Sequence, residues 1–265
     1  MPELPRSPDD VPRVTAHRAV SPPDLDGRLA AACWRDAPPT SRFVDLVSGA
    51  ATSLDTRAAL LWDDEHLYVG FRLEARGVVA TLTERDAHIW LDDDVELFVA
   101  GPDAYYELEI NALGTVYEVL FVWDDVADRA PFDAVPTLRR DHPQAAPFDG
   151  VDLRHPRGPR TGFWGFDLPG LRTAVAVDGP LEAARAWSVE IAIPWAGLTP
   201  LAGGRALTPR DGDEWRIALA RFNTRTDGPE DSGGWSWSPH GVWDSHVPEL
   251  FPVVTFSSAP PPRRR

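Results

Sequence analysis

The sequence of 265 residues contains no lysine, so its 26 basic residues are all arginine. Without a lysine amine the chain can perform no Schiff-base chemistry and has no phosphate-binding loop of the usual lysine type. The chain is also acidic, with 41 Asp and Glu residues and a net charge of −15. Because phosphate backbones are bound by clustered basic residues, this charge argues against nucleic acid as a partner and leaves neutral, cationic and metal partners open.

Cysteine and methionine occur once each, as Cys33 and Met1. A single cysteine excludes an internal disulfide, a CxxC redox pair and a cysteine-rich zinc site, and we expect Cys33 to be buried near Trp34. A single methionine at the start of the chain effectively excludes haem held between histidine and methionine. A site of two histidines is the remaining haem alternative, although we expect its candidates to be solvated turn residues: His66, His88, His240 and His246. We therefore expect no haem.

Long apolar runs are also missing, so we expect no membrane-spanning segment and no membrane partner. The first residues, MPELPRSPDDVPRV, lack the apolar core of roughly 7 to 15 residues that a secretory signal requires, which favours a soluble cytoplasmic chain unless a leader has been removed. Residues 1–23 and the tail 258–265 are rich in proline and polar residues, and we expect both to be disordered or extended. Residues 24–257 are predicted to form a single domain.

Within that domain the sequence is dominated by short strand patterns. LLWDDEHLYVGFRL predicts a hairpin, and DVELFVAGPDAYYELEINALGTVYEVLF predicts three further strands with turns at 101–103 and at Gly114. Later strands are predicted in TAVAVDG, WSVEIAIPW, WRIALARFN and VVTF, and residues 124–172 form a long loop region of the kind that often carries function. These patterns predict an all-β fold, an antiparallel β-sandwich of jelly-roll type with long loops.

The strand beginning at Asp94 has two distinct faces. Side chains alternate across a strand, so Val95, Leu97 and Val99 are predicted to face the core. If this strand pairs with the next one through the turn at 101–103, one polar sheet face carries four side chains with Trp90 at its edge: Glu96, Glu107, Glu109 and Asn111. Acceptors beside an aromatic ring can bind a sugar, but a solvated sheet face gives the same pattern.

Tryptophan is abundant, with 11 residues. Five of them lie in or beside apolar strands and are predicted to be buried: Trp34, Trp62, Trp187, Trp195 and Trp215. Trp243 differs because it lies in a loop rich in glycine, proline and serine, where an exposed aromatic ring more often binds a ligand.

Seven stretches in this order resemble the family 9 carbohydrate-binding modules, in the stand-alone group related to DOMON sandwiches: LDGRLAAACW, LLWDDEHLYVGFRL, DAHIWLDDDVELFV, YYELEINALGTVYEV, WSVEIAIPW, WRIALARFN and WSPHGVWDSHVPELFPVVTF. The resemblance covers roughly residues 26–256. It implies an antiparallel β-sandwich that binds mono- or oligosaccharides, or polysaccharide chain ends, without hydrolysis. It also implies an extracellular or periplasmic location, in conflict with the absent signal, and leaves the oligomeric state undetermined.

The resemblance further implies a site in which a pyranose lies between Trp90 and Trp243 while Glu96 and Asn111 bind its hydroxyl groups. This sequence departs from the family pattern at Glu109, where the best-known members have an arginine two residues before the asparagine. A guanidinium from the neighbouring strand, that of Arg221, is our candidate replacement.

Three alternatives stay open. The resemblance implies structural calcium, for which Asp92, Asp93 and Asp94 offer oxygen ligands, although a solvated turn explains each aspartate equally well. Glu96 with Glu107 or Glu109 could form the carboxylate pair of a glycan-processing hydrolase. The chain could also be a sandwich scaffold that has lost its sugar site.

Overall fold

A computed structural model describes residues 3–224 and 231–262, so Met1 lies outside the described residues. The strands are β1 (Arg13–Arg18), β2 (Val44–Asp45), β3 (Thr56–Trp62), β4 (His66–Glu74), β5 (Asp94–Ala100), β6 (Ala104–Asn111), β7 (Val116–Trp123), β8 (Ala145–Phe148), β9 (Arg160–Phe163), β10 (Arg172–Val177), β11 (Ala186–Pro194), β12 (Glu214–Phe222), β13 (Gly234–Ser236) and β14 (Val253–Ser257). The chain is thus all-β, as predicted.

Helices are short. The α-helix α1 spans Ala32–Asp36, and the 3-10 helices are η1 (Pro8–Asp10), η2 (Ile89–Leu91), η3 (Phe132–Ala134), η4 (Pro136–Leu138), η5 (Leu181–Ala183), η6 (Trp195–Leu201) and η7 (Pro248–Leu250). In the described part of the chain, none of these helices has the length and apolarity needed to cross a lipid bilayer.

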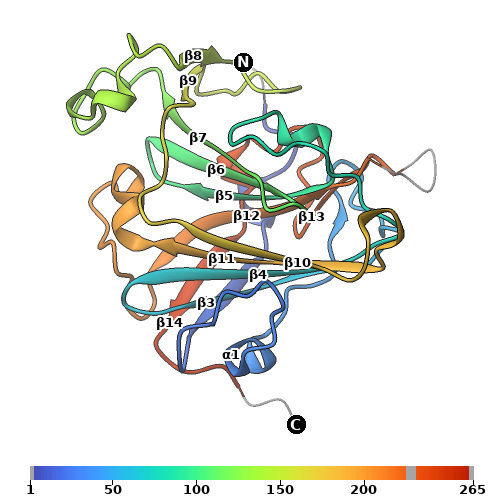
Figure 1. The fold of residues 1–265 in the computed structure, drawn as a ribbon. Helices are drawn as coiled ribbons and strands as arrows, with labels where there is room; N and C mark the ends of the chain where they lie inside the picture. Colours follow the sequence, from blue (N-terminus) through green and yellow to red (C-terminus); the bar gives the residue numbers. More distant parts are fainter. Residues whose placement is uncertain (1–2, 225–230, 263–265) are drawn as a thin grey trace.

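The strands form two facing layers joined into one hydrogen-bonded path, β10-β11-β4-β3-β1-β14-β12-β5-β6-β7-β9-β8. Figure 1 shows β10, β11, β4 and β3 in one layer and β12, β5, β6 and β7 in the other. The main buried cluster lies between them, because it contains Phe71 of β4, Val189 of β11, Leu97 of β5 and Leu219 of β12. The predicted hairpins and the predicted β-sandwich are therefore confirmed.

Two parts of the architecture differ from the sequence-based expectation. Residues 13–18, within the segment expected to be disordered or extended, form β1, which pairs in parallel with β14 and with β3 and so joins the two layers. The loop region after Asp124 contains two short strands, β8 and β9, that extend the sheet beyond β7. Alternation was absent from these proline-rich and arginine-rich segments, so pattern alone could not identify them.

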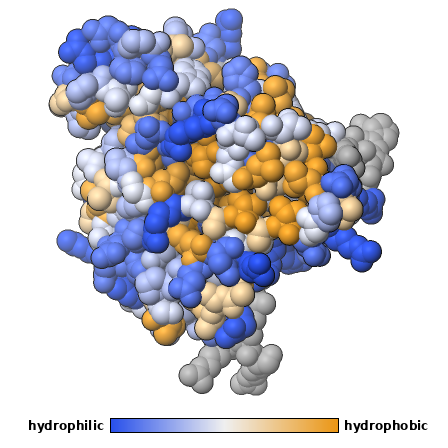
Figure 2. All heavy atoms as spheres, in the orientation of Figure 1, coloured by the Kyte–Doolittle hydropathy of each residue, from blue (hydrophilic) through white to orange (hydrophobic). Residues whose placement is uncertain are grey.

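The face drawn in Figure 2 carries hydrophobic residues over its middle, where β10 lies in Figure 1, and hydrophilic residues on the loops above. β10 pairs with β11 and is the last strand on that side of the path. All five tryptophans predicted to be in the core are buried: Trp34, Trp62, Trp187, Trp195 and Trp215.

One buried carboxylate joins the N-terminal part of the domain to its centre. Glu190 of β11 is fully buried and accepts hydrogen bonds from the Trp34 indole at 2.5 Å and from the backbone amides of Asp26 and Gly27 at 2.9 and 2.7 Å. The chain approaches β10 so closely at Gly27 that a Cβ there would lie 2.5 Å from the backbone carbon of Val175. Glu190 therefore stabilises a segment of chain that lies against the sheet.

We expect Glu190→Gln to lower the free energy of unfolding by about 1 to 3 kcal/mol. The side-chain nitrogen of glutamine cannot accept a hydrogen bond, so it would face an N–H donor that now bonds to a carboxylate oxygen. Glu182→Gln, on an exposed glutamate of η5, is the matched control and should leave stability unchanged. Urea denaturation of the three proteins measures this difference. Equal midpoints for all three would show that Glu190 does not anchor the segment.

Candidate ligand-binding site

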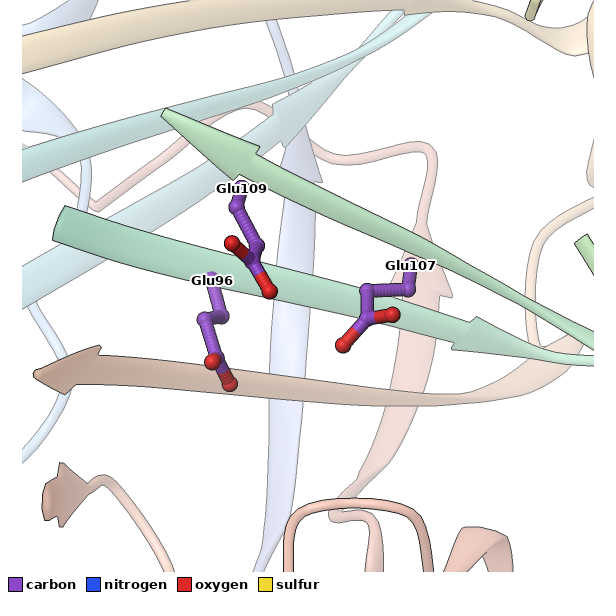
Figure 3. A group of neighbouring side chains, drawn as sticks. All are labelled: Glu96, Glu107 and Glu109. Carbon is purple, nitrogen blue, oxygen red and sulfur yellow. The ribbon is translucent and has the colours of Figure 1, made fainter. Parts of the chain in front are cut away.

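The pairing of β5 with β6 brings three glutamates together. Glu96 lies opposite Glu109, and Phe98 lies opposite Glu107, so the three carboxyl groups share the sheet face that points away from the main core. Figure 3 shows the three side chains extending to the same side of the two neighbouring strands. Each offers a carboxylate oxygen, and these oxygens lie within 4.8 Å of one another. The shared polar face predicted from strand alternation is confirmed.

This face is buried beneath loops, so the alternative of a solvated sheet face is wrong. Glu96, Glu107 and Glu109 are each at most 5% exposed. A second apolar cluster covers the same side of the sheet and includes Phe98, Tyr105, Tyr117, Phe121 and Phe251. The loops that follow β8 and β13 therefore convert an open sheet face into the floor of a cavity.

The cavity has a volume of about 310 Å³ and an aromatic wall above its acidic floor. Its lining residues are Trp90, Glu96, Glu107, Glu109, Tyr117, Phe121, Phe148, Val151, Trp164, Phe222, Trp243, Asp244, Ser245 and His246. Both tryptophans that the resemblance implied thus lie at one cavity, together with Glu96 and Glu109. A concave, largely apolar pocket with a few polar groups at its base is the usual form of a small-molecule site.

Trp90 is held in place while its ring stays 43% exposed. It lies in η2 beside the buried Ile89, stacks on His88 at 4.5 Å with an interplanar angle of 17°, and contacts Tyr117 edge-on at 5.2 Å. A large aromatic ring that is supported on one side and open on the other is suited to stacking on a ligand.

Trp243 is half-buried and comes from the loop before β14. Its ring meets Phe222 edge-on at 5.3 Å, and a Cβ at Gly234 would lie only 2.7 Å from it, so glycine leaves room for the ring. The next residue, Asp244, accepts hydrogen bonds from the backbone amides of Val151, Asp152, Leu153 and His246, and thus ties two loops of the wall together.

The electrostatics of the floor are unusual because its carboxyl groups are buried side by side. Burial raises the pKa of Glu96 to about 8. Burial, with repulsion from the neighbouring carboxylates, raises the pKa of both Glu107 and Glu109 well above the ordinary value. Burial therefore favours the protonated form of these carboxyl groups in the absence of a ligand.

Among the described lining residues, His246 is the basic side chain that pairs with a carboxyl group of the floor, that of Glu107. His246 places Nε2 3.5 Å from Glu107, but burial lowers the pKa of this histidine to about 3, so it is neutral. Oε2 of Glu96 and Oε2 of Glu109 are buried and accept no hydrogen bond from any described residue. These two oxygens can receive donors from a ligand.

Two predicted site residues do not line the cavity. Asn111 is fully buried and its amide is used: it donates to Leu82 O and Asp92, and accepts from the backbone amides of Leu113 and Thr115. Arg221 lies on the opposite face of the sheet.

Arg221 is fully buried there, where it donates to Thr56 Oγ1 at 3.0 Å and Glu74 O at 2.8 Å and lies over the ring of Trp235. Its partner in register is Val95, which faces the core. The expectation that Arg221 replaces the missing guanidinium is therefore wrong.

Two of the three aspartates predicted to bind calcium are committed to backbone contacts. Asp92 accepts hydrogen bonds from the amides of Thr81 and Leu82, and Asp93 from those of Val79 and Thr224. Oδ2 of Asp92 also accepts from Asn111, which leaves that oxygen no free lone pair for an ion. Asp94 is buried, and its Oδ2 accepts no hydrogen bond from the described residues. Asp92 therefore fits a calcium ion poorly, and calcium binding by this run stays a prediction.

Several wall residues were not identified from the sequence. Tyr117 lies opposite Glu109 in the pairing of β6 with β7, so alternation on β7 could have revealed it. Phe148, Val151 and Trp164 come from the long loop region, where no periodic pattern fixes their position.

Comparisons with known proteins concern the sequence of one part of the chain and its fold. Residues 25–120 match a family described as carbohydrate family 9 binding domain-like. A search of curated proteins found no match. A solved structure from Bacteroides uniformis, described as a "putative carbohydrate-binding protein", is similar with a TM-score of 0.60 and 16% identity over 93% of this chain and 99% of that one.

Two further structures are family 9 carbohydrate-binding modules from Caldicellulosiruptor kristjanssonii, one in complex with glucose and one with cellotriose. The glucose complex has a TM-score of 0.52 and 14% identity over 92% of this chain and 96% of that one. The cellotriose complex has a TM-score of 0.53 and 14% identity, covering 93% and 94%. The chain therefore has the fold of these modules, and its residues 25–120 are similar in sequence to the family 9 carbohydrate-binding domain.

Proposed function

We propose that this protein binds carbohydrate without hydrolysing it, and that one pyranose ring at the end of a sugar chain enters the cavity between Trp90 and Trp243. The observation that carries the proposal is the joint lining of one cavity by these two tryptophans and three buried glutamates. A volume of about 310 Å³ is at the lower end for small-molecule sites, which favours a chain end over an extended internal segment.

Sugar chemistry fits both halves of the cavity. The C–H face of a pyranose is apolar and packs on an aromatic ring, for which Trp90 and Trp243 are available. Its hydroxyl groups need acceptors, and Glu96 and Glu109 each have an oxygen without a partner among the described residues. The similar modules that were solved with glucose and with cellotriose support the same ligand class.

Hydrolysis is disfavoured by the direction in which the carboxyl pKa values move. A glycosidase needs one protonated and one ionised carboxyl group, so the pKa values of these two groups must differ. Here burial raises the pKa of Glu96, Glu107 and Glu109 alike. The direction of these shifts therefore does not divide the three groups into an acid and a base.

Removing the exposed ring should abolish most of the affinity. We expect Trp90→Ala to weaken sugar binding about 5-fold to 150-fold, taking the loss of about 1 to 3 kcal/mol seen for a stacked nucleobase as a guide. Isothermal titration calorimetry with glucose, cellobiose, xylobiose and cellotriose measures the change.

Leu91→Ala is the matched control, because Leu91 is the next residue, is 64% exposed and does not line the cavity. It should bind as the unmodified protein does. Equal affinities for the Trp90 variant and the unmodified protein would contradict the stacking role.

A second experiment separates binding from catalysis. We expect no release of nitrophenol when the protein is incubated with a panel of aryl glycosides between about pH 5 and 8, because no carboxyl pair is divided into acid and base. The control is Glu96→Gln at the same concentration. Turnover by the unmodified protein that this variant loses would replace the binding function with a glycosidase.

A further inference from the structure

We infer that the cavity selects a pyranose that bears a protonated amine, such as the terminal residue of an amino-sugar chain, over its uncharged counterparts. The inference rests on the proposed function, since it names the class of sugar that the same site takes. Its basis is the combination of an aromatic wall with a buried floor of carboxyl groups and no cationic side chain among the described lining residues.

The charge of the cavity has one sign. Four of its lining residues carry carboxyl groups: Glu96, Glu107, Glu109 and Asp244. None of the described lining residues is an arginine, and the one histidine is neutral because burial lowers its pKa to about 3. A ligand entering this space meets carboxyl oxygens and no cationic side chain among the described lining residues. A cationic group favours the ionised form of these carboxyls, so it gains more there than a neutral group.

A buried cation lies next to the aromatic wall, since the guanidinium carbon of Arg160 is 5.1 Å from the centre of the Phe148 ring. Arg160 is fully buried and donates to Tyr105 Oη at 2.9 Å and to His246 O at 2.7 Å. Its charge offsets part of the rise in the pKa of Glu107, but Arg160 is not among the causes of the shifts of Glu96 and Glu109. The two glutamates whose pKa is not lowered by Arg160 are therefore the two that have an oxygen without a hydrogen-bond partner among the described residues, Glu96 and Glu109.

An ammonium group would meet both needs of that floor. Buried carboxylates are costly unless they are both paired with charge and hydrogen-bonded. A sugar hydroxyl supplies one hydrogen bond and no charge, whereas a protonated amine supplies three N–H donors and a positive charge. Glu96 Oε2 and Glu109 Oε2 lie on facing residues of adjacent strands, so one ammonium group can approach both.

The aromatic wall favours an organic cation over a metal ion. Trp90, Tyr117, Trp164 and Trp243 line the space above the glutamates, and aromatic faces attract organic ammonium groups. A calcium ion would need six to eight oxygen ligands and would make no use of those rings. The amine-bearing pyranose uses the floor and the wall together.

Binding should release protons. The titratable and charged groups that face the floor or its supports are Asp94, Glu96, Glu107, Glu109, Tyr117, Arg160, Asp244 and His246. Burial raises the pKa of the three glutamates and so favours their protonated form, whereas a neighbouring ammonium group favours their ionised form. The affinity for the amine should accordingly rise with pH between about 5 and 7, before the amine itself loses its proton.

The experiment compares three sugars on the full chain by calorimetry at about pH 6.5: glucosamine, glucose and N-acetylglucosamine. We expect glucosamine to bind at least about tenfold more tightly than the other two, given the strength of hydrogen bonds between charged groups. Titrations in buffers of different ionisation enthalpy should detect proton release with glucosamine and none with glucose.

Glu109→Gln should reduce the ratio of glucosamine to glucose affinity, while the exposed control Glu182→Gln should keep it. Because the comparison of the three sugars uses the unmodified protein, it stands even if Glu109→Gln fails to fold. Equal binding of all three sugars would overturn the amine inference and leave carbohydrate binding intact.

Absence of binding by any sugar, including cellotriose, would overturn the proposed function and the amine inference together. Binding of calcium chloride alone, followed by calcium-dependent binding of glucose, would assign the glutamates to a metal ion and also overturn the inference. The four outcomes are thus distinguishable in one set of titrations.

Discussion

The candidate site depends on the register between β5 and β6. Side chains alternate across strands, so a slip of one residue would send Glu96 into the core and Val95 into the cavity. The short turn at 101–103 joins the two strands in the register that places Glu96 opposite Glu109. Glycine is needed in this turn, because a Cβ at Gly101 would lie 2.5 Å from the carbonyl oxygen of Leu201.

The register of β5 and β6 alone would place the glutamates on a solvent-exposed sheet face. The loops that cover this face convert it into a cavity. Asp244 holds the loop at 151–153 against the loop at 244–246 through four backbone amides, and the aromatic wall comes with these loops. Burial then raises the pKa of every glutamate on the floor. The loops that cover the glutamates therefore have two opposite effects: their contacts stabilise the fold, and the burial of the carboxyl groups destabilises it. A ligand with suitable donors would reduce the cost of burying the carboxyl groups and leave the loop contacts in place.

Alternation in the sequence was sufficient to predict the strands, the core face of Val95 and Leu97, and the shared face of Glu96 and Glu109, since these depend on period and on one short turn. It failed for Arg221, because the face of that side chain follows from pairing with β5, a contact between segments far apart in sequence. It also failed for Asn111, which lies at a strand end where the following turn uses its amide. The wall residues from the long loop region have no period from which a position could be inferred.

Hydrogen-bond donors distinguish the structural carboxylates of this chain from those of the site. Burial alone would raise the pKa of Asp45, yet the hydroxyls and amides of Ser232 and Ser48 lower it to about 2, and the amides of Leu82 and Thr81 similarly lower the pKa of Asp92.

Burial raises the pKa of Glu96 to about 8, because the one donor that lowers it, the Ser245 hydroxyl, does not offset the desolvation of this carboxyl group. Where the protein uses a carboxylate to hold its own loops, it supplies the donors itself. On the floor of the cavity, two carboxyl oxygens have no hydrogen-bond donor among the described residues. A ligand would have to supply these donors.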